Sequence, residues 1–194
     1  MRINGIFILS GLLCLILLIV INSVNAASKV DEAGTHLPLI AEFRGGILVH
    51  NIGPIAPDEE HGVDVNMELH FQPPKFLSAL GEPKPFVGTT INTEGDTSFL
   101  YTGFMWDFDI TESFFASLGL GMTVHNGNSG VVEEGDGLTT LGCWWLFRES
   151  LEFGYKLDKQ VSISVLWDHV SHGELCSDRN SGMDNMGLRL HYTF

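Results

Sequence analysis

Three residues near the C-terminus have side chains of the types that could together form a hydrolytic site. His169 and Ser171 stand two residues apart, and Asp184 follows after a short polar stretch. A serine hydroxyl becomes a nucleophile when a neighbouring base takes its proton, and histidine titrates close to neutral pH. A carboxylate can hold that histidine in the required tautomer. The three side chains therefore predict acyl transfer to water, with Ser171 as nucleophile, His169 as base and Asp184 as the orienting acid.

The alternation of the surrounding sequence indicates which face these residues occupy. Segment 161–167 alternates apolar and polar residues, and His169 and Ser171 keep the phase of its apolar positions. Asp184 begins the next predicted strand in phase with the apolar Met186. Side chains two residues apart on a strand share a face and lie about 7 Å apart along it. A His-x-Ser pair also occurs at strand ends without a catalytic role, so the prediction depends on the coincidence of all three groups.

The same period of two recurs along the chain and predicts an all-β fold. Proline cannot donate to a strand ladder, and the seven prolines fall before, between or at the start of the alternating segments. The eight segments lie at about 40–51, 62–72, 85–93, 97–109, 113–125, 139–157, 159–170 and 183–194.

Either a soluble β-domain or a membrane barrel could bury the apolar face, and three features favour the barrel. Several segments reach about 11 residues, close to the 9–11 that a tilted spanning strand needs. The chain ends in phase on an aromatic residue, Phe194. The polar face carries charges of both signs, which could pair inside a closed barrel: Glu68, His70, Arg148, Glu152, Arg189 and His191. We therefore expect an eight-stranded antiparallel outer-membrane β-barrel over residues 40–194, with an interior filled by side chains.

The N-terminus has the pattern of a secretory signal peptide. Arg2 precedes an apolar run over 6–21, and Val-Asn-Ala at 24–26 supplies small residues at a cleavage site. A retained membrane anchor is the alternative, since the run approaches the roughly 20 residues that span a bilayer. Cleavage after residue 26 would leave 27–39 as an N-terminal periplasmic segment.

Composition and residue spacing limit the classes of binding partner that the sequence predicts. A net charge of −14 argues against nucleic acid, whose binders carry basic stripes. A possible metal cluster is formed by residues close in sequence, Asp168, His169, His172, Cys176 and Asp178. Parity, however, puts Asp168 and His169 on opposite faces, and the firm zinc spacings are missing. We therefore expect no metal and no cofactor. Cys143 and Cys176 could pair in an oxidising compartment.

The C-terminal half also resembles a known enzyme family. LFRESLEFGYKLD at 146–158, DHVSHGEL at 168–175 and NSGMDNMGLRLHYTF at 180–194 are similar to the lipid A 3-O-deacylase (PagL-type acyloxyacyl hydrolase) family. The resemblance implies a serine esterase in the outer membrane of a Gram-negative bacterium. Such an enzyme removes the 3-O-linked acyl chain of lipid A, the anchor of lipopolysaccharide, with its triad on the lipid-facing surface. The family's catalytic positions fall on the same three residues.

Two departures from the family pattern concern the acid and the oxyanion donor. The best-known members use Glu where this chain has Asp184, and an Asn commonly follows the nucleophile where this chain has His172. Asn180 matches another Asn proposed for the oxyanion hole, so we expect Asn180 first, and His172 second, as oxyanion or substrate-binding residues. One such donor is worth about 2.7–4 kcal/mol in other hydrolases.

Other functions stay open at this stage. A non-enzymatic outer-membrane barrel, structural or adhesive, predicts that Ser171 is dispensable. A soluble secreted β-barrel that binds a small apolar ligand predicts that the protein does not partition with the outer membrane. A homodimer is a further expectation that the sequence does not test.

Overall fold

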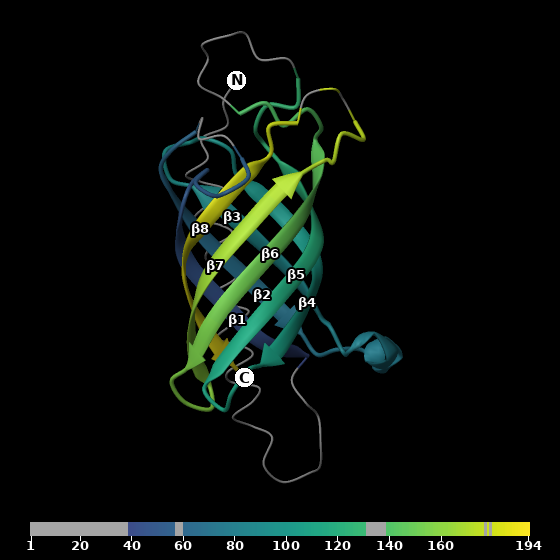
Figure 1. Cartoon of the computed structure of the whole chain (residues 1–194), viewed down its shortest axis with the longest axis vertical. Coiled ribbons are helices and arrows are strands. Elements are labelled where there is room, and N and C mark those ends of the chain that lie inside the picture. The colour runs from purple at the N-terminus through teal and green to yellow at the C-terminus, as the bar shows by residue number, and fades with distance from the viewer. Residues whose placement is uncertain (1–38, 57–59, 131–138, 177, 179) are drawn as a thin grey trace.

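Eight antiparallel strands form a closed barrel in the computed structural model, which describes residues 39–56, 60–130, 139–176, 178 and 180–194. The predicted signal peptide and nearly all of segment 27–39 lie outside this part of the chain. Each strand pairs with the next, and β1 with β8 closes the ring (Figure 1). The predicted fold class is thus confirmed. The strands are β1 (Ile40–Val49), β2 (Val63–Phe71), β3 (Lys84–Asn92), β4 (Phe99–Asp109), β5 (Phe114–His125), β6 (Trp145–Lys156), β7 (Val161–Ser171) and β8 (Met183–Thr193).

Two strand boundaries differ from the predicted ones in ways that affect the site. The sixth segment was expected to begin at 139, but β6 begins at Trp145, because Gly142 adopts a left-handed φ of 69° and turns the chain. Residues 139–144 therefore belong to the preceding loop. β7 continues one residue beyond its expected end, so that Ser171 is its last residue.

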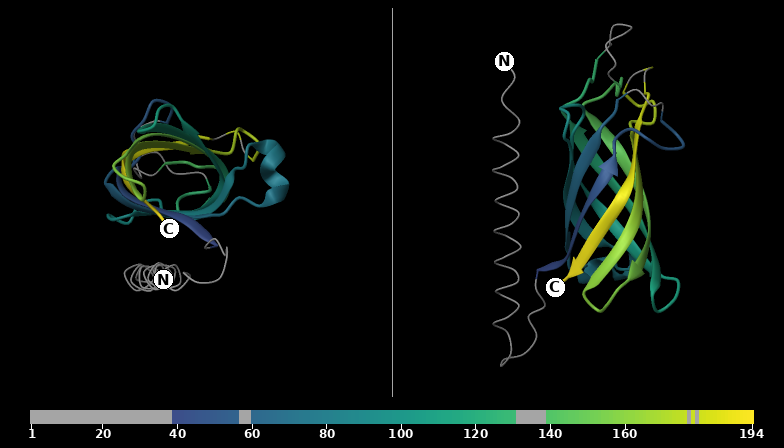
Figure 2. Two further views of the ribbon diagram at one scale, coloured as in Figure 1. Left: turned by 90° about the horizontal axis from the view of Figure 1, so that it is seen from below. Right: turned by 90° about the vertical axis from the view of Figure 1, so that its left-hand side faces the viewer.

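The two rims of the barrel differ. Four connections meet at one end, which we call the loop rim: 50–62, 93–98, 126–144 and 172–182. The chain enters β1 and leaves β8 at the opposite end, the turn rim, where 110–113 and 157–160 are short (Figures 1 and 2). The third turn-rim connection contains a 3-10 turn, η1 (Lys75–Leu80), which stands beside the barrel. No helix in the described part of the chain is long and apolar enough to cross a membrane.

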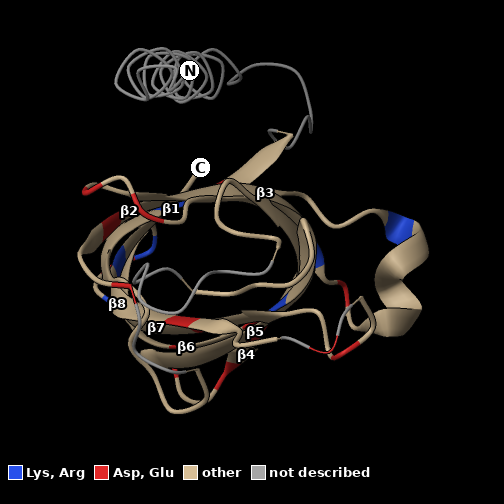
Figure 3. Ribbon diagram, turned by 90° about the horizontal axis from the view of Figure 1, so that it is seen from above, with Lys and Arg blue, Asp and Glu red and all other residues tan. Residues whose placement is uncertain are grey.

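The interior of the barrel is charged and the outer wall is apolar. Arg44, Arg148 and Arg189 are among the largest fully buried side chains. Arg189 pairs with Glu68 at 2.7 Å, and Arg148 with Asp168 at 2.9 Å. Buried charges are tolerated only when they are paired in this way. Figure 3 shows the wall as a closed ring seen from the loop rim.

Large apolar side chains on the outside complete this inverted arrangement. Leu188 is 69% exposed and Phe153 is 57% exposed, although both belong to regular strands. A soluble barrel would bury these positions, whereas a membrane barrel presents them to lipid. The parity of the sequence had predicted the same distribution.

Candidate active site at the loop rim

His169 and Asp184 form the centre of the candidate site. They are register partners on β7 and β8, and His169 Nδ1 lies 2.6 Å from Asp184 Oδ1. An ionised carboxylate can only accept a hydrogen bond, so Nδ1–H is the donor. Nε2 of the neutral imidazole then carries the lone pair that a general base needs. Trp167 stacks against the imidazole with ring centroids 6.4 Å apart.

Asp184 occupies the outward phase that the sequence predicted, but it does not face lipid. Its side chain is fully buried, because residues of the 50–62 loop cover it. The backbone N–H groups of Ile55 and Ala56 donate to Oδ2 at 2.7 and 3.2 Å. Both carboxylate oxygens therefore have partners, which is what a charge beside an apolar surface requires.

Ser171 lies on the same side of β7 as His169 and is half-buried. Within the described residues, no hydrogen bond joins its hydroxyl to the imidazole. Catalytic hydrogen bonds are often long without substrate and shorten only in the complex. The structure thus brings His169 and Asp184 into contact and leaves Ser171 as their neighbour on one face.

The loop that follows Ser171 folds back toward His169. Asn180 Oδ1 accepts a hydrogen bond from the backbone N–H of His172 at 3.2 Å, which directs the amide Nδ2 away from that backbone. His172 itself is fully buried, and its Nδ1 accepts from the backbone N–H of Cys176 at 3.4 Å. A methyl group at Gly182, which has a φ of 67°, would lie 3.0 Å from Cε1 of His169. The returning loop therefore packs directly against the imidazole edge.

A disulfide ties this loop to its neighbour. Cys143, at the end of the 126–144 loop, is bonded to Cys176 of the 172–182 loop. The sequence left this pairing open. The bridge connects the segment after Ser171 to the start of β6, and it limits how far the two loops can separate.

Glu149 lies beside the candidate site, and no role was assigned to it from the sequence. It is the register partner of His169 on β6, so that Glu149, His169 and Asp184 follow one another across three strands. Its Oε2 is buried and has no hydrogen-bond partner among the described residues. Its phase with the apolar Phe147 and Leu151 was the signal that could have identified it.

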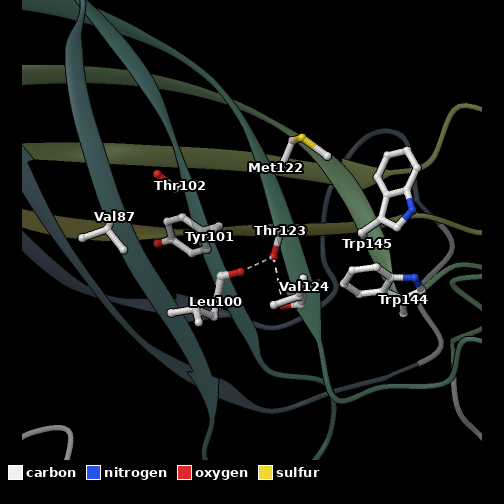
Figure 4. A pocket seen from close by; sticks show the side chains of 9 residues that line it. All are labelled: Val87, Leu100, Tyr101, Thr102, Met122, Thr123, Val124, Trp144 and Trp145. Carbon is white, nitrogen blue, oxygen red and sulfur yellow. Dashed lines mark hydrogen bonds between the residues drawn. The ribbon is translucent and has the colours of Figure 1, made fainter.

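An apolar groove of about 510 Å³ lies on the outer wall beside the site. Figure 4 shows Trp144 and Trp145 at one end and Val87 at the other. The lining is carbon-rich and comes from β3, β4, β5, the start of β6 and the loop residue just before it. Its residues are Val87, Leu100, Tyr101, Thr102, Met122, Thr123, Val124, Trp144 and Trp145.

In the described part of the chain, no cluster of three or more His, Cys, Asp or Glu side chains is arranged to hold a metal ion. What the site offers is a base, an orienting carboxylate, a hydroxyl and an amide donor. Groups of these four kinds can together support acyl transfer by proton transfer and hydrogen bonding.

A charged interior, an apolar outer wall and a His–carboxylate pair beside a serine define an outer-membrane β-barrel with a candidate hydrolytic site. The model of the lipid A 3-O-deacylase (PagL) family matches residues 84–193, which is more than half of the chain. The protein belongs to this family. The match extends the resemblance seen in the C-terminal half back through β4 to the start of β3.

Solved structures show the same fold. The crystal structure of the outer-membrane enzyme PagL aligns with a TM-score of 0.55 and 19% identity, over 78% of this chain and 99% of that one. The crystal structure of Neisserial surface protein A (NspA) aligns with a TM-score of 0.51 and 10% identity, over 79% and 97%. Among curated proteins, none matches the chain.

Proposed function

We propose that this protein is an outer-membrane esterase that removes the 3-O-linked acyl chain of lipid A. The observation that carries the proposal is the bond between His169 and Asp184 on the outward side of the wall, two residues from Ser171. The site lies at the loop rim. We place this rim outside the cell, where lipopolysaccharide forms the outer leaflet.

The geometry supports a two-step hydrolysis. Ser171 Oγ attacks the ester carbonyl while His169 Nε2 takes its proton, and His169 then returns that proton to the departing sugar hydroxyl. Water hydrolyses the acyl-serine with His169 again as base. Asp184 orients the imidazole and stabilises its charged form. We assign the oxyanion donor to Asn180 Nδ2, because the backbone N–H of His172 already donates to Asn180 and the His172 ring is buried.

The outer groove supports an acyl chain as substrate. Register partners form a row across the wall from the serine to the groove: Ser171, Phe147, Met122, Thr102 and Val87. Four strand spacings of about 4.8 Å and a tilt of about 40° give a descent of about 12 Å along this row. In Figure 1, β7 rises to the right and β6 and β5 follow on that side, so the row descends away from the loop rim. A chain esterified near Ser171 would therefore run into the bilayer.

Glu149 provides a polar contact for the lipid. Its buried Oε2, which has no hydrogen-bond partner among the residues that the structure describes, lies one strand from His169. Because a buried acceptor without a partner is costly, a substrate hydroxyl or amide N–H that donates to it would be bound selectively. We infer that Glu149 helps to distinguish lipid A from simple acyl esters.

Mass spectrometry of lipid A incubated with the purified, folded protein tests the function. We expect the wild type to remove one 3-O-linked acyl chain from lipid A. Ser162→Ala, which changes a serine on the turn-rim half of β7, should do the same. Ser171→Ala and His169→Ala are expected to leave lipid A unchanged. Unchanged lipid A with wild-type protein that shows heat-modifiable gel migration would refute the proposal. The homodimer stays a prediction.

A further inference from the structure

We propose that residues 53–56 of the 50–62 loop are a positioning element for the orienting carboxylate, Asp184. Their backbone holds this carboxylate so that one of its oxygens points at His169. The inference rests on the proposed function and extends it to a segment of the N-terminal half. That segment lies outside residues 84–193, the part of the chain that the family model matches.

The two carboxylate oxygens of Asp184 bind different partners. Oδ1 accepts from His169 Nδ1 at 2.6 Å, while Oδ2 accepts from Ile55 N–H at 2.7 Å and Ala56 N–H at 3.2 Å. Two consecutive backbone donors on one oxygen, together with the imidazole on the other, restrict the plane of the carboxylate as well as its position. A carboxylate fixed in plane holds the imidazole within the narrow range of angles that proton transfer needs.

Gly53 allows the loop to approach this closely. A methyl group built on Gly53 would overlap Cβ, Cγ and Oδ2 of Asp184. The backbone at Gly53 therefore touches the acid directly. Because Asp is one methylene shorter than Glu, the loop occupies the space that a longer acid would fill.

Contacts on both sides of residues 53–56 anchor the loop to the barrel. Before them, Asn51 N–H donates to Asn185 Oδ1 at 3.0 Å, next to Asp184 on β8. After them, the Glu60 carboxylate accepts from the backbone N–H groups of Thr97 and Thr139 at 3.0 and 2.9 Å. Glu60 is fully buried. The positioning element thus lies between a contact to β8 on one side and contacts to the 93–98 and 126–144 connections on the other.

Paired variants separate the backbone donor from the side chain that carries it. Ile55→Pro removes the N–H that lies 2.7 Å from Asp184, because proline has no backbone N–H. Ile55→Ala is its control, since it keeps the N–H and shortens a side chain that is 61% exposed. Gly53→Ala displaces the carboxylate, and Gly130→Ala places the same methyl on another loop, 3.5 Å from its nearest neighbour.

Deacylation kinetics on lipid A in detergent micelles are the readout. We expect Ile55→Pro and Gly53→Ala to lower kcat by about 10- to 100-fold with little change in apparent KM, because they misplace a group that acts in the transition state. Both controls should stay within about threefold of the wild type. In an Asp184→Asn background, Ile55→Pro should cause no further loss, because its effect passes through that carboxylate.

The outcomes separate this inference from the proposed function. Equal kcat for Ile55→Pro and Ile55→Ala, or a full additional loss in the Asp184→Asn background, would overturn the positioning role alone. A folded wild type that leaves lipid A intact would overturn the proposed function and the inference with it. If Ile55→Pro loses heat-modifiable migration, it does not fold. The kcat of Gly53→Ala then decides: a lowered kcat supports the positioning role, and a kcat equal to that of the wild type overturns it.

Discussion

Replacing His50 with asparagine is expected to remove a pH-dependent part of the barrel's stability. His50 follows β1 in the 50–62 loop, and its ring lies between two carboxylates. Nδ1 is 2.9 Å from Asp64 Oδ2, and Nε2 is 3.1 Å from Glu60 Oε2, with all three side chains fully buried. Burial by itself lowers the pKa of His50. The hydrogen bonds and charges of Asp64 and Glu60 outweigh burial and raise that pKa from 6.5 to about 9.

The sign and size of the effect follow from proton linkage. A histidine whose pKa is higher in the folded protein contributes its full stability below pH 6.5, and the contribution disappears as the pH rises through 9. A pKa of about 9 against 6.5 gives about 3 kcal/mol at pH 6, about 2 kcal/mol at pH 7.5 and about 0.2 kcal/mol at pH 9.5. Hydrogen bonds from His50, Thr97 and Thr139 outweigh burial and lower the pKa of Glu60, so its carboxylate stays ionised across this window.

Urea unfolding in detergent, followed by circular dichroism at pH 6, 7.5 and 9.5, measures the contribution. The difference in unfolding free energy between the wild type and His50→Asn should shrink by about 3 kcal/mol over this range. Any part that does not change with pH reports lost packing. Glu60→Gln leaves one carboxylate beside the ring and should give an intermediate pH dependence. A difference that stays constant from pH 6 to 9.5 would show that His50 is not charged in the folded protein.

Three further substitutions test the site from other directions. Asp184→Glu should lower kcat roughly 10-fold or more on lipid A, although Glu is the family's usual acid, because Gly53 already contacts the shorter side chain. Activity equal to the wild type would contradict the close packing. Met122→Trp fills the outer groove and should slow hydrolysis of long acyl esters more than short ones. An equal effect on all chain lengths would contradict the assigned path. Glu149→Leu should reduce kcat/KM on lipid A by about 10- to 100-fold, the worth of a hydrogen bond to a charged group, and change little on a simple acyl ester.

Much of the fold could be predicted because every strand of a membrane barrel alternates between residues that face the lipid and residues that face the interior. Side chains alternate with a period of two, so the apolar positions of 161–167 fix the outward direction of His169 and Ser171 without any knowledge of their neighbours. The same rule predicted that Arg148 and Arg189 would pair with buried carboxylates inside. Eight strands followed from counting the alternating segments.

Irregular segments did not follow from the sequence, because no period governs them. Residues 139–144 alternate like a strand and were predicted to be one. In the structure Gly142 adopts a left-handed conformation that turns the chain, and β6 begins at Trp145. The burial of Asp184 also did not follow from the sequence. Parity gave its direction, but a loop more than a hundred residues earlier in the chain covers it.

The sequence by itself determined the strand count, the inward and outward faces, and the presence of a base and a hydroxyl on one outward strand face. These properties depend on neighbours along the chain, and local alternation records them. Only the tertiary structure decided that Asp184 is shielded by Ile55 and Ala56, that Glu149 stands beside His169, and that Cys143 reaches Cys176. Each of these contacts joins segments far apart in sequence, and barrel closure and loop packing select them.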